Sequence, residues 1–224
     1  MAAVIAIAFA TGLLPSPCHP TLSKYPRALA LRGGGPALNL AAGVGAAYSM
    51  ALANHPIMTQ SVTSALTFAL SDTVAQSISP PPGGRGLKRT VVTAAIGLLY
   101  FGPALHYFLM WVTALVPGTD LLSTLQKTLL GQLGFGPAMT CIFFGAFLVA
   151  DHGISSGLKQ WPAKIRQDLL VTWTTELCFW PFVDIVYYSF LPVVWIPLGY
   201  NIANFFWTVF LSLQAARGLR KTQS

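Results

Sequence analysis

The stretch that decides the fold is LLVTWTTELCFWPFVDIVYYSFLP, residues 169–192, because it is apolar over the length of a membrane crossing yet contains two acids. At 1.5 Å rise per residue, a helix of this length spans about 36 Å, against a hydrocarbon core of about 30 Å. A carboxylate at that depth costs at least ~2.5 kcal/mol and usually faces a bundle interior or a wet cavity. Glu176 and Asp184 lie about 80° apart in helical projection, and Pro181 between them predicts a bend. We therefore expect a bent helix with one acidic edge.

A second interpretation gives both acids a structural role only. The helix would be shorter, with Glu176 at the membrane interface and Asp184 paired with Tyr187 or Tyr188. The sequence leaves both interpretations open.

The composition indicates a membrane protein. Of the 224 residues, 54% are hydrophobic and 8% are charged, whereas soluble domains carry about 25% charged residues. The net charge of +7 does not indicate a nucleic-acid partner, because Lys and Arg stand at the ends of apolar runs rather than in a stripe with aromatic residues. We expect the lipid bilayer, and no nucleic acid, as a partner.

The chain divides into a targeting presequence over residues 1–36, a single transmembrane helical domain over 37–216 and a basic tail over 217–224. No acid precedes Asp72, and the basic residues of the first segment are scattered among Ala, Ser, Pro and Gly, which is typical of transit peptides. A mitochondrial presequence, a bipartite plastid presequence and a merely disordered tail remain alternatives.

The fold class is all-α: a polytopic membrane bundle with four or five transmembrane helices. The apolar and helical segments are residues 37–79, 90–116, 128–150, 169–192 and 200–216, with a polar loop predicted at 151–168. The loops at 80–90 and 151–168 and the C-terminus share nine Lys and Arg, whereas the opposite loops carry only Lys127. This asymmetry places the basic face in the cytosol, matrix or stroma.

An internal echo, G-x-x-x-F-G-P-A, occurs at residues 97–104 and again 34 residues later at 131–138. Glycine permits close approach between helices and the proline bends each helix, so we expect a tightly packed, kinked pair; coincidence in Gly-rich sequence is the alternative. The candidate kink and packing residues are Gly97, Gly102, Pro103, Gly131, Gly136 and Pro137, with Trp180 and Pro181 in the acidic stretch.

Catalytic motifs are missing from the sequence: there is no phosphate loop, dinucleotide fingerprint, HExxH or nucleophile elbow. Cys and His residues show no metal-ligand spacing. We expect no enzyme, no metal and no cofactor.

The order of landmarks over residues 48–213 resembles the Mpv-seventeen / twenty-two-kilodalton peroxisomal membrane protein family. The landmarks in chain order are Tyr48, Leu52, His55, Pro56, Thr59, Gln60, Thr63, Asp72, Gln76, Arg89, Gly97, Gly102, Pro103, His106, Pro117, Lys127, Gln132, Gly136, Pro137, Trp161, Trp173, Trp180, Pro181, Pro192 and Trp207. The chain departs from the family pattern where Glu176, Asp184, Tyr187, Trp195 and Gly131 replace residues that are typically Asn, Gln, Asn, Arg and Asp.

The resemblance implies a small integral protein of an organelle membrane, without enzymatic activity or cofactor, that passes small solutes or keeps the organelle metabolically balanced. The mitochondrial inner membrane is favoured, with plastid and peroxisomal membranes as alternatives.

We hypothesise a channel or pore for small solutes or ions, as a monomer or homo-oligomer. The candidate pore-lining residues are Asp72, His106, Gln132, Glu176 and Asp184. An acidic lining predicts a preference for cations. The alternative is a structural or scaffolding membrane protein in which the buried acids only set helix register.

Overall fold

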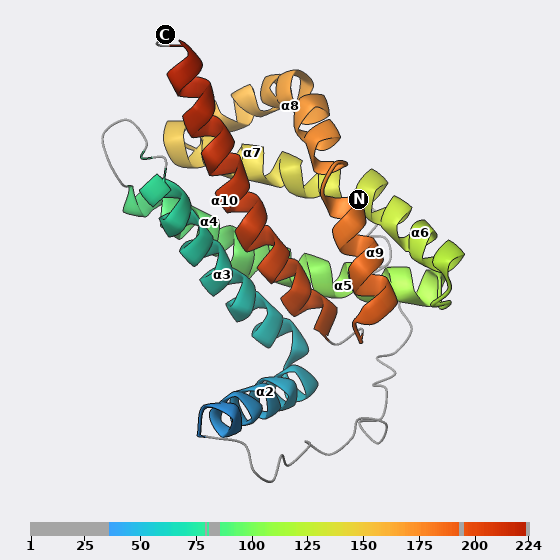
Figure 1. The fold of residues 1–224 in the computed structure, drawn as a ribbon. Coiled ribbons are helices and arrows are strands. Elements are labelled where there is room, and N and C mark those ends of the chain that lie inside the picture. Colours follow the sequence, from blue (N-terminus) through green and yellow to red (C-terminus); the bar gives the residue numbers. More distant parts are fainter. Residues whose placement is uncertain (1–35, 79, 81–85, 193–194, 223–224) are drawn as a thin grey trace. The chain divides into compact units, whose positions relative to one another are not determined.

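The computed structural model describes residues 36–78, 80, 86–192 and 195–222, and each element in this part of the chain is a helix (Figure 1). The chain divides into two compact units between Thr59 and Gln60. The elements in order are α2 Pro36–Asn54, α3 Pro56–Ile78, α4 Leu87–Ile96, η2 Gly97–Phe101, α5 Gly102–Leu115, α6 Leu121–Leu130, η3 Gly131–Phe135, α7 Gly136–His152, α8 Ile154–Glu176, α9 Trp180–Phe190 and α10 Ile196–Thr222.

The described part of the first unit consists of α2 and the first turn of α3. Helix α3 begins at Pro56 because proline tolerates the first helical turn, where its missing N–H has no intrahelical acceptor to lose. The predicted presequence, residues 1–36, lies outside the described residues except for Pro36.

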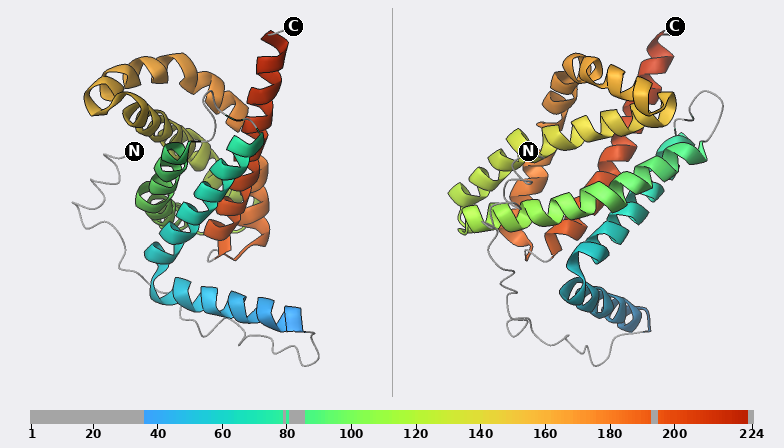
Figure 2. Two further views of the ribbon diagram at one scale, coloured as in Figure 1. Left: turned by 90° about the vertical axis from the view of Figure 1, so that its left-hand side faces the viewer. Right: turned by 180° about the vertical axis from the view of Figure 1, so that it is seen from behind.

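In the second unit, two long helical rods form a hairpin (Figure 2). One rod is α4–η2–α5 and the other is α6–η3–α7, with the turn Val116–Asp120 between them. Helix α4 packs on α7 and α5 packs on α6, so the rods are antiparallel neighbours. Asp120 starts α6 by accepting the backbone N–H of Ser123, which satisfies one of the donors at the helix N-terminus.

Each copy of the sequence echo forms the same local structure, a π-helical turn followed by a proline in the next turn of α-helix. The turns are η2 and η3, and the prolines are Pro103 and Pro137. A π turn contains one residue more than an α turn, and such turns are a known cause of helix bends. The expected bends therefore have a definite backbone origin.

Most glycines of the echo face helices outside the hairpin, although a Cβ at Gly131 would also lie 3.7 Å from Phe108 Cζ of the opposite rod. Gly97 and Gly102 contact Ser64 and Ser61 of α3, whereas Gly131 and Gly136 lie beneath carboxylates of α9 and α8. The hairpin itself is held by aromatic rings, with Phe135 stacked on Phe108 at 4.8 Å between centroids.

The polar loop predicted at residues 151–168 is wrong, because α8 begins at Ile154 and runs through it. Tertiary packing explains the helix: Gly157 lies against the α7 backbone at Leu148 and Val149, and the Trp161 indole covers Gly145. Polar residues fit the outer face of such a helix. Sequence polarity alone gave the wrong boundary.

The acidic stretch bends on the N-terminal side of Pro181, beginning at the carbonyl four residues back for which proline has no N–H, as the sequence predicts. The helix breaks over residues 177–179, before Pro181, and Pro181 then occupies the first turn of α9. Helices α8 and α9 meet at 48° and together have the length and composition of a broken membrane span or a re-entrant loop. A proline in the first turn has no hydrogen bond to lose, so the chain places the bend before it.

By length and composition, two helical rods of the described residues are able to cross a membrane, Leu87–Leu115 and Leu121–Ala150, or three if α8 and α9 count as one span. The predicted crossing near residues 57–79 is helix α3, whose buried side chains are mostly polar. The predicted fifth span lies in α10, whose side chains beyond Val209 fall outside the described part. The molecule is an all-helical, polytopic membrane protein.

Candidate functional site: a polar interface between helices

A line of buried polar side chains runs along the second rod, on the side that faces α9 and α8. Positions four residues apart on an α-helix are neighbours on one face, and the line follows that spacing. Its members are Thr124, Lys127, Thr128, Gln132 and Thr140, each with at most 8% of its side chain exposed. We call this line, together with Glu176 and Asp184, the polar interface.

Asp184 lies in the middle of the polar interface and is 2% exposed. Its Oδ2 accepts a hydrogen bond of 3.0 Å from Gln132 Nε2, and its Oδ1 accepts one from the Tyr200 hydroxyl of α10. The carboxylate thus joins η3, α9 and α10. A Cβ added at Gly131 would lie 3.7 Å from Asp184 Oδ2, so the glycine leaves room for the acid.

Glu176, the last residue of α8, is 9% exposed and lies farther along the same interface. Its Oε1 accepts a 2.8 Å hydrogen bond from the Thr140 hydroxyl of α7. Gly136 lies beneath it, since a Cβ there would be 3.7 Å from Glu176 Oε2. The break between α8 and α9 allows both acids to face the second rod.

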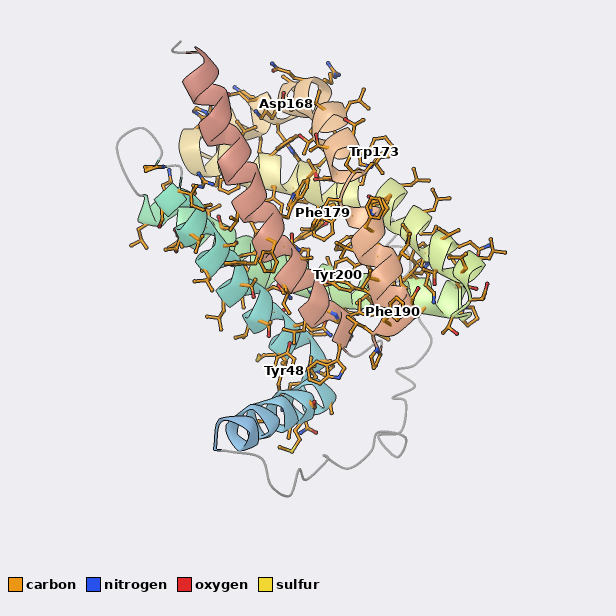
Figure 3. The ribbon with its side chains drawn as sticks, viewed as in Figure 1. Tyr48, Asp168, Trp173, Phe179, Phe190 and Tyr200 are labelled. Carbon is orange, nitrogen blue, oxygen red and sulfur yellow. The ribbon has the colours of Figure 1, made fainter. Side chains whose placement is uncertain are left out.

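The backbone of the π turn contributes to this site as well. Gly136 N–H donates to Gly131 O in the π pattern, so the next donor in that pattern, for Gln132 O, would be residue 137. Residue 137 is proline and has no N–H. The indole Nε1 of Trp173 on α8, labelled in Figure 3, donates to Gln132 O instead, and the two atoms are 2.8 Å apart. Trp173 thereby satisfies the carbonyl next to the Gln132–Asp184 pair.

Asp72 does not join the polar interface in any contact of the described residues. It is 1% exposed and forms an ion pair of 2.8 Å with Arg89 Nε. Its Oδ2 also accepts hydrogen bonds from Thr90 (2.7 Å) and Gln76 (2.6 Å), and Gln76 Oε1 accepts the Gly86 N–H. Asp72 is therefore a neutralised, structural acid that links α3 to the start of α4.

His106 lies on α5, half-buried, with its ring edge-on to Tyr107 at 5.4 Å between centroids. Within the described part of the chain, no hydrogen bond or ion pair joins it to Asp72, Glu176 or Asp184. Of the five candidate lining residues, the structure brings together Gln132 and Asp184 and places Glu176 on the same interface.

Sequence reasoning missed Thr140, Tyr200 and Trp173 as partners of this site. The sequence could have predicted Thr140, because it lies eight residues after Gln132 and thus close to the same helix face. No sequence pattern predicts Tyr200 or Trp173, since their contacts to Asp184 and Gln132 O depend on how separate helices pack.

Comparisons with known proteins place this chain near one family of membrane proteins. Residues 154–212 match the model of the Mpv17 / PMP22 family. "PXMP2/4 family protein 1" of Dictyostelium discoideum is 23% identical over 81% of this chain and 89% of the relative. "Mitochondrial inner membrane protein Mpv17" is 28% identical in Xenopus laevis (78% of this chain, 98% of the relative) and 29% in Homo sapiens (76% and 97%). No solved structure matches. The chain is similar to members of the Mpv17 / PMP22 family of membrane proteins over most of its length, and residues 154–212 match the family model itself.

Proposed function

We propose that this protein passes small solutes or ions across an organelle membrane, along the polar interface between the second rod and the α8–α9 pair. The observation that carries the proposal is that Glu176 and Asp184 are buried carboxylates without a basic partner among the described residues. A buried charge without a counter-ion is costly, and ionisable residues inside membrane helices usually mark ion or substrate pathways. Two acids on one route favour cations over anions.

A comparison with Asp72 supports the assignment of Glu176 and Asp184 as lining residues. Arg89 neutralises Asp72 within the fold, so it needs no passing cation, and we remove it from the set of lining residues. The proposed route is lined by Gln132, Thr140, Glu176 and Asp184.

We propose the mitochondrial inner membrane as the location, because the Xenopus laevis and Homo sapiens relatives are named as proteins of that membrane. Plastid and peroxisomal membranes are the alternatives. Organelle fractionation of cells that express the tagged full chain separates the three.

One observation favours a second candidate, a scaffold without transport. Both Asp184 oxygens accept hydrogen bonds, from η3 and from α10, so this acid also holds three helices in register. Buried polar contacts of this kind specify helix packing in some proteins. A scaffold would need the hydrogen bonds of the acid and would not need its charge.

The test is conductance of the full chain in liposomes, wild type beside the double variant Glu176→Gln/Asp184→Asn. Each amide removes the charge, keeps one acceptor oxygen and replaces the other oxygen with an NH2 donor; at position 184, the Tyr200 hydroxyl can turn toward that donor as an acceptor. We expect cation-selective conductance in the wild type and a cation-to-anion permeability ratio reduced by about tenfold in the variant. This corresponds to about 1.4 kcal/mol of lost charge stabilisation.

Asp168→Asn is the matched control, because Asp168 is paired with Lys164 at 2.6 Å on the outer part of α8, away from the acids. It should leave selectivity unchanged. Folded wild-type protein that conducts nothing, together with a double variant altered only in detergent stability, would favour the scaffold and reject the channel.

A further inference from the structure

Lys127 is a buried cation that forms no ion pair among the described residues; Asp120, the N-cap of α6, acts on it only from beyond ion-pair distance. Lys127 lies on α6 within the polar interface and is 4% exposed. Its ammonium donates to the Gly118 carbonyl at 2.6 Å and lies 5.5 Å from the centre of the Tyr188 ring. The ion pairs among the described residues are Arg89–Asp72 and Lys164–Asp168, and neither includes Lys127. One carbonyl leaves two ammonium hydrogens without a partner, and the Asp120 carboxylate, which is bonded to Ser123, offsets the positive charge only in part.

Two hydroxyls next to Lys127 are also without partners. Thr124 and Thr128 lie three residues before and one residue after it on the buried face of α6, with 0% and 6% exposure. Their Oγ1 atoms form no hydrogen bond within the described structure. Threonine in a helix normally donates to a carbonyl of the preceding turn, as Thr73 and Thr113 do here. Buried polar atoms left unpaired are uncommon and costly in native proteins.

These groups share one chemistry: a positive charge and hydrogen-bond donors, with no acid in an ion pair or hydrogen bond to any of them among the described residues. The hydroxyls contribute two O–H donors and the ammonium two more. A cation would be repelled, and a neutral solute would leave the charge unpaired. A tetrahedral oxyanion carries negative charge and enough acceptor oxygens to bind several donors at once, through charge-assisted hydrogen bonds.

We propose that Lys127, Thr124 and Thr128 form a binding site for a phosphate group. The site lies about 9 Å into α6 from Leu121, at 1.5 Å per residue, near the turn that joins the two rods. At that depth the phosphate can come from free phosphate in the aqueous phase or from a phospholipid headgroup. The proposal does not depend on transport, because it rests on the lysine end of the interface and not on Glu176 or Asp184.

The experiment measures thermal unfolding of the purified full chain in a non-ionic detergent without phospholipid. One arm titrates inorganic phosphate against sodium chloride of equal ionic strength, and the other adds phosphatidic acid to the micelles. Ligands that bind only the folded state raise the melting temperature. Equilibrium dialysis of the wild type with labelled phosphate measures binding directly and needs no variant.

The decisive variant is Thr124→Val/Thr128→Val, which keeps side-chain shape and the Lys127–Gly118 bond while removing both unpaired hydroxyls. Without ligand it should be at least as stable as the wild type, and its affinity for phosphate should fall about tenfold with the loss of two hydrogen bonds. Lys127→Met should abolish the phosphate-induced shift. Thr174→Val/Thr175→Val is the matched control, because both of those hydroxyls already donate to backbone carbonyls.

A shift produced by inorganic phosphate identifies free phosphate as the source, and a shift produced by phosphatidic acid alone identifies the lipid headgroup. An equal shift in the wild type and in Thr124→Val/Thr128→Val would overturn the proposal. Unchanged melting of the wild type in both arms, with no phosphate retained in dialysis, would overturn it as well.

Discussion

The two copies of G-x-x-x-F-G-P-A have the same local backbone and opposite surroundings. Both form a π turn followed by a proline-containing α turn. In the first copy, a Cβ at Gly102 would lie 2.4 Å from the Ser61 Cα, and one at Gly97 would lie 2.7 Å from Ser64 O. In the second copy, Cβ atoms at Gly131 and Gly136 would lie 3.7 Å from the Asp184 and Glu176 carboxylates.

The motif determines the backbone of its own helix, whereas the packing of the other helices determines what its glycines contact. The repeated residues set the π turn and the bend. In the first copy the glycines allow two helix backbones to touch, as small residues do in membrane bundles. In the second copy the equivalent glycines leave room for two buried acids, so this copy of the motif lies directly beside the candidate functional site.

The largest expected difference in stability is between two glycine-to-alanine variants, one in each copy of the motif. Gly102→Ala should destabilise the protein by about 2 kcal/mol or more, because the methyl collides with backbone that cannot move aside cheaply. Gly136→Ala meets ordinary contact distances and gains helix propensity, so it should be neutral or stabilising by up to about 1 kcal/mol. Thermal unfolding in detergent measures both, and equal losses would refute the contrast drawn from the distances.

The second comparison concerns the two kinds of buried acid. Asp72→Asn leaves Arg89 without its charge partner, and we expect a loss of about 1–3 kcal/mol. This is less than breaking a fully buried pair, because Arg89 is 45% exposed. Asp184→Asn removes a charge that has no basic partner among the described residues, so its loss should be smaller. Chemical denaturation of both variants in the same detergent measures the order, and the reverse order would contradict the assignment of Asp72 as the neutralised acid.

The smallest expected effect compares two tryptophans of α8 that both donate to carbonyls of the second rod. Trp173→Phe should cost about 1 kcal/mol beyond the effect of Trp161→Phe, because Gln132 O then loses the donor that Pro137 cannot replace. Cys141 O, the acceptor of Trp161 at 2.7 Å, lies within regular α-helix and already has a backbone donor. Melting temperatures of the two variants measure this difference. If both variants lose the same stability, the π turn leaves no carbonyl that needs the Trp173 donor.

The sequence by itself determined the class of protein and the main hairpin. Few charges and long apolar runs exclude a soluble domain, since burying ionised groups in lipid is costly. Pro56 marks the start of α3, and the proline-glycine turn at residues 116–120 separates the two rods. These features depend on composition and on residues near one another in the chain, so one sequence is sufficient to read them.

Only the tertiary structure decided the start of α8 and the different environments of the three buried acids. Helix α8 extends over a polar segment because Gly157 and Trp161 pack on α7, a contact between residues that no local pattern joins. Asp72 lies 17 positions before Arg89 and is neutralised by it, whereas Asp184 receives Gln132 from 52 positions away and Tyr200 from the next helix. Charge compensation is a property of atoms within a few ångströms of one another, and which atoms meet at that distance is set by how the helices pack.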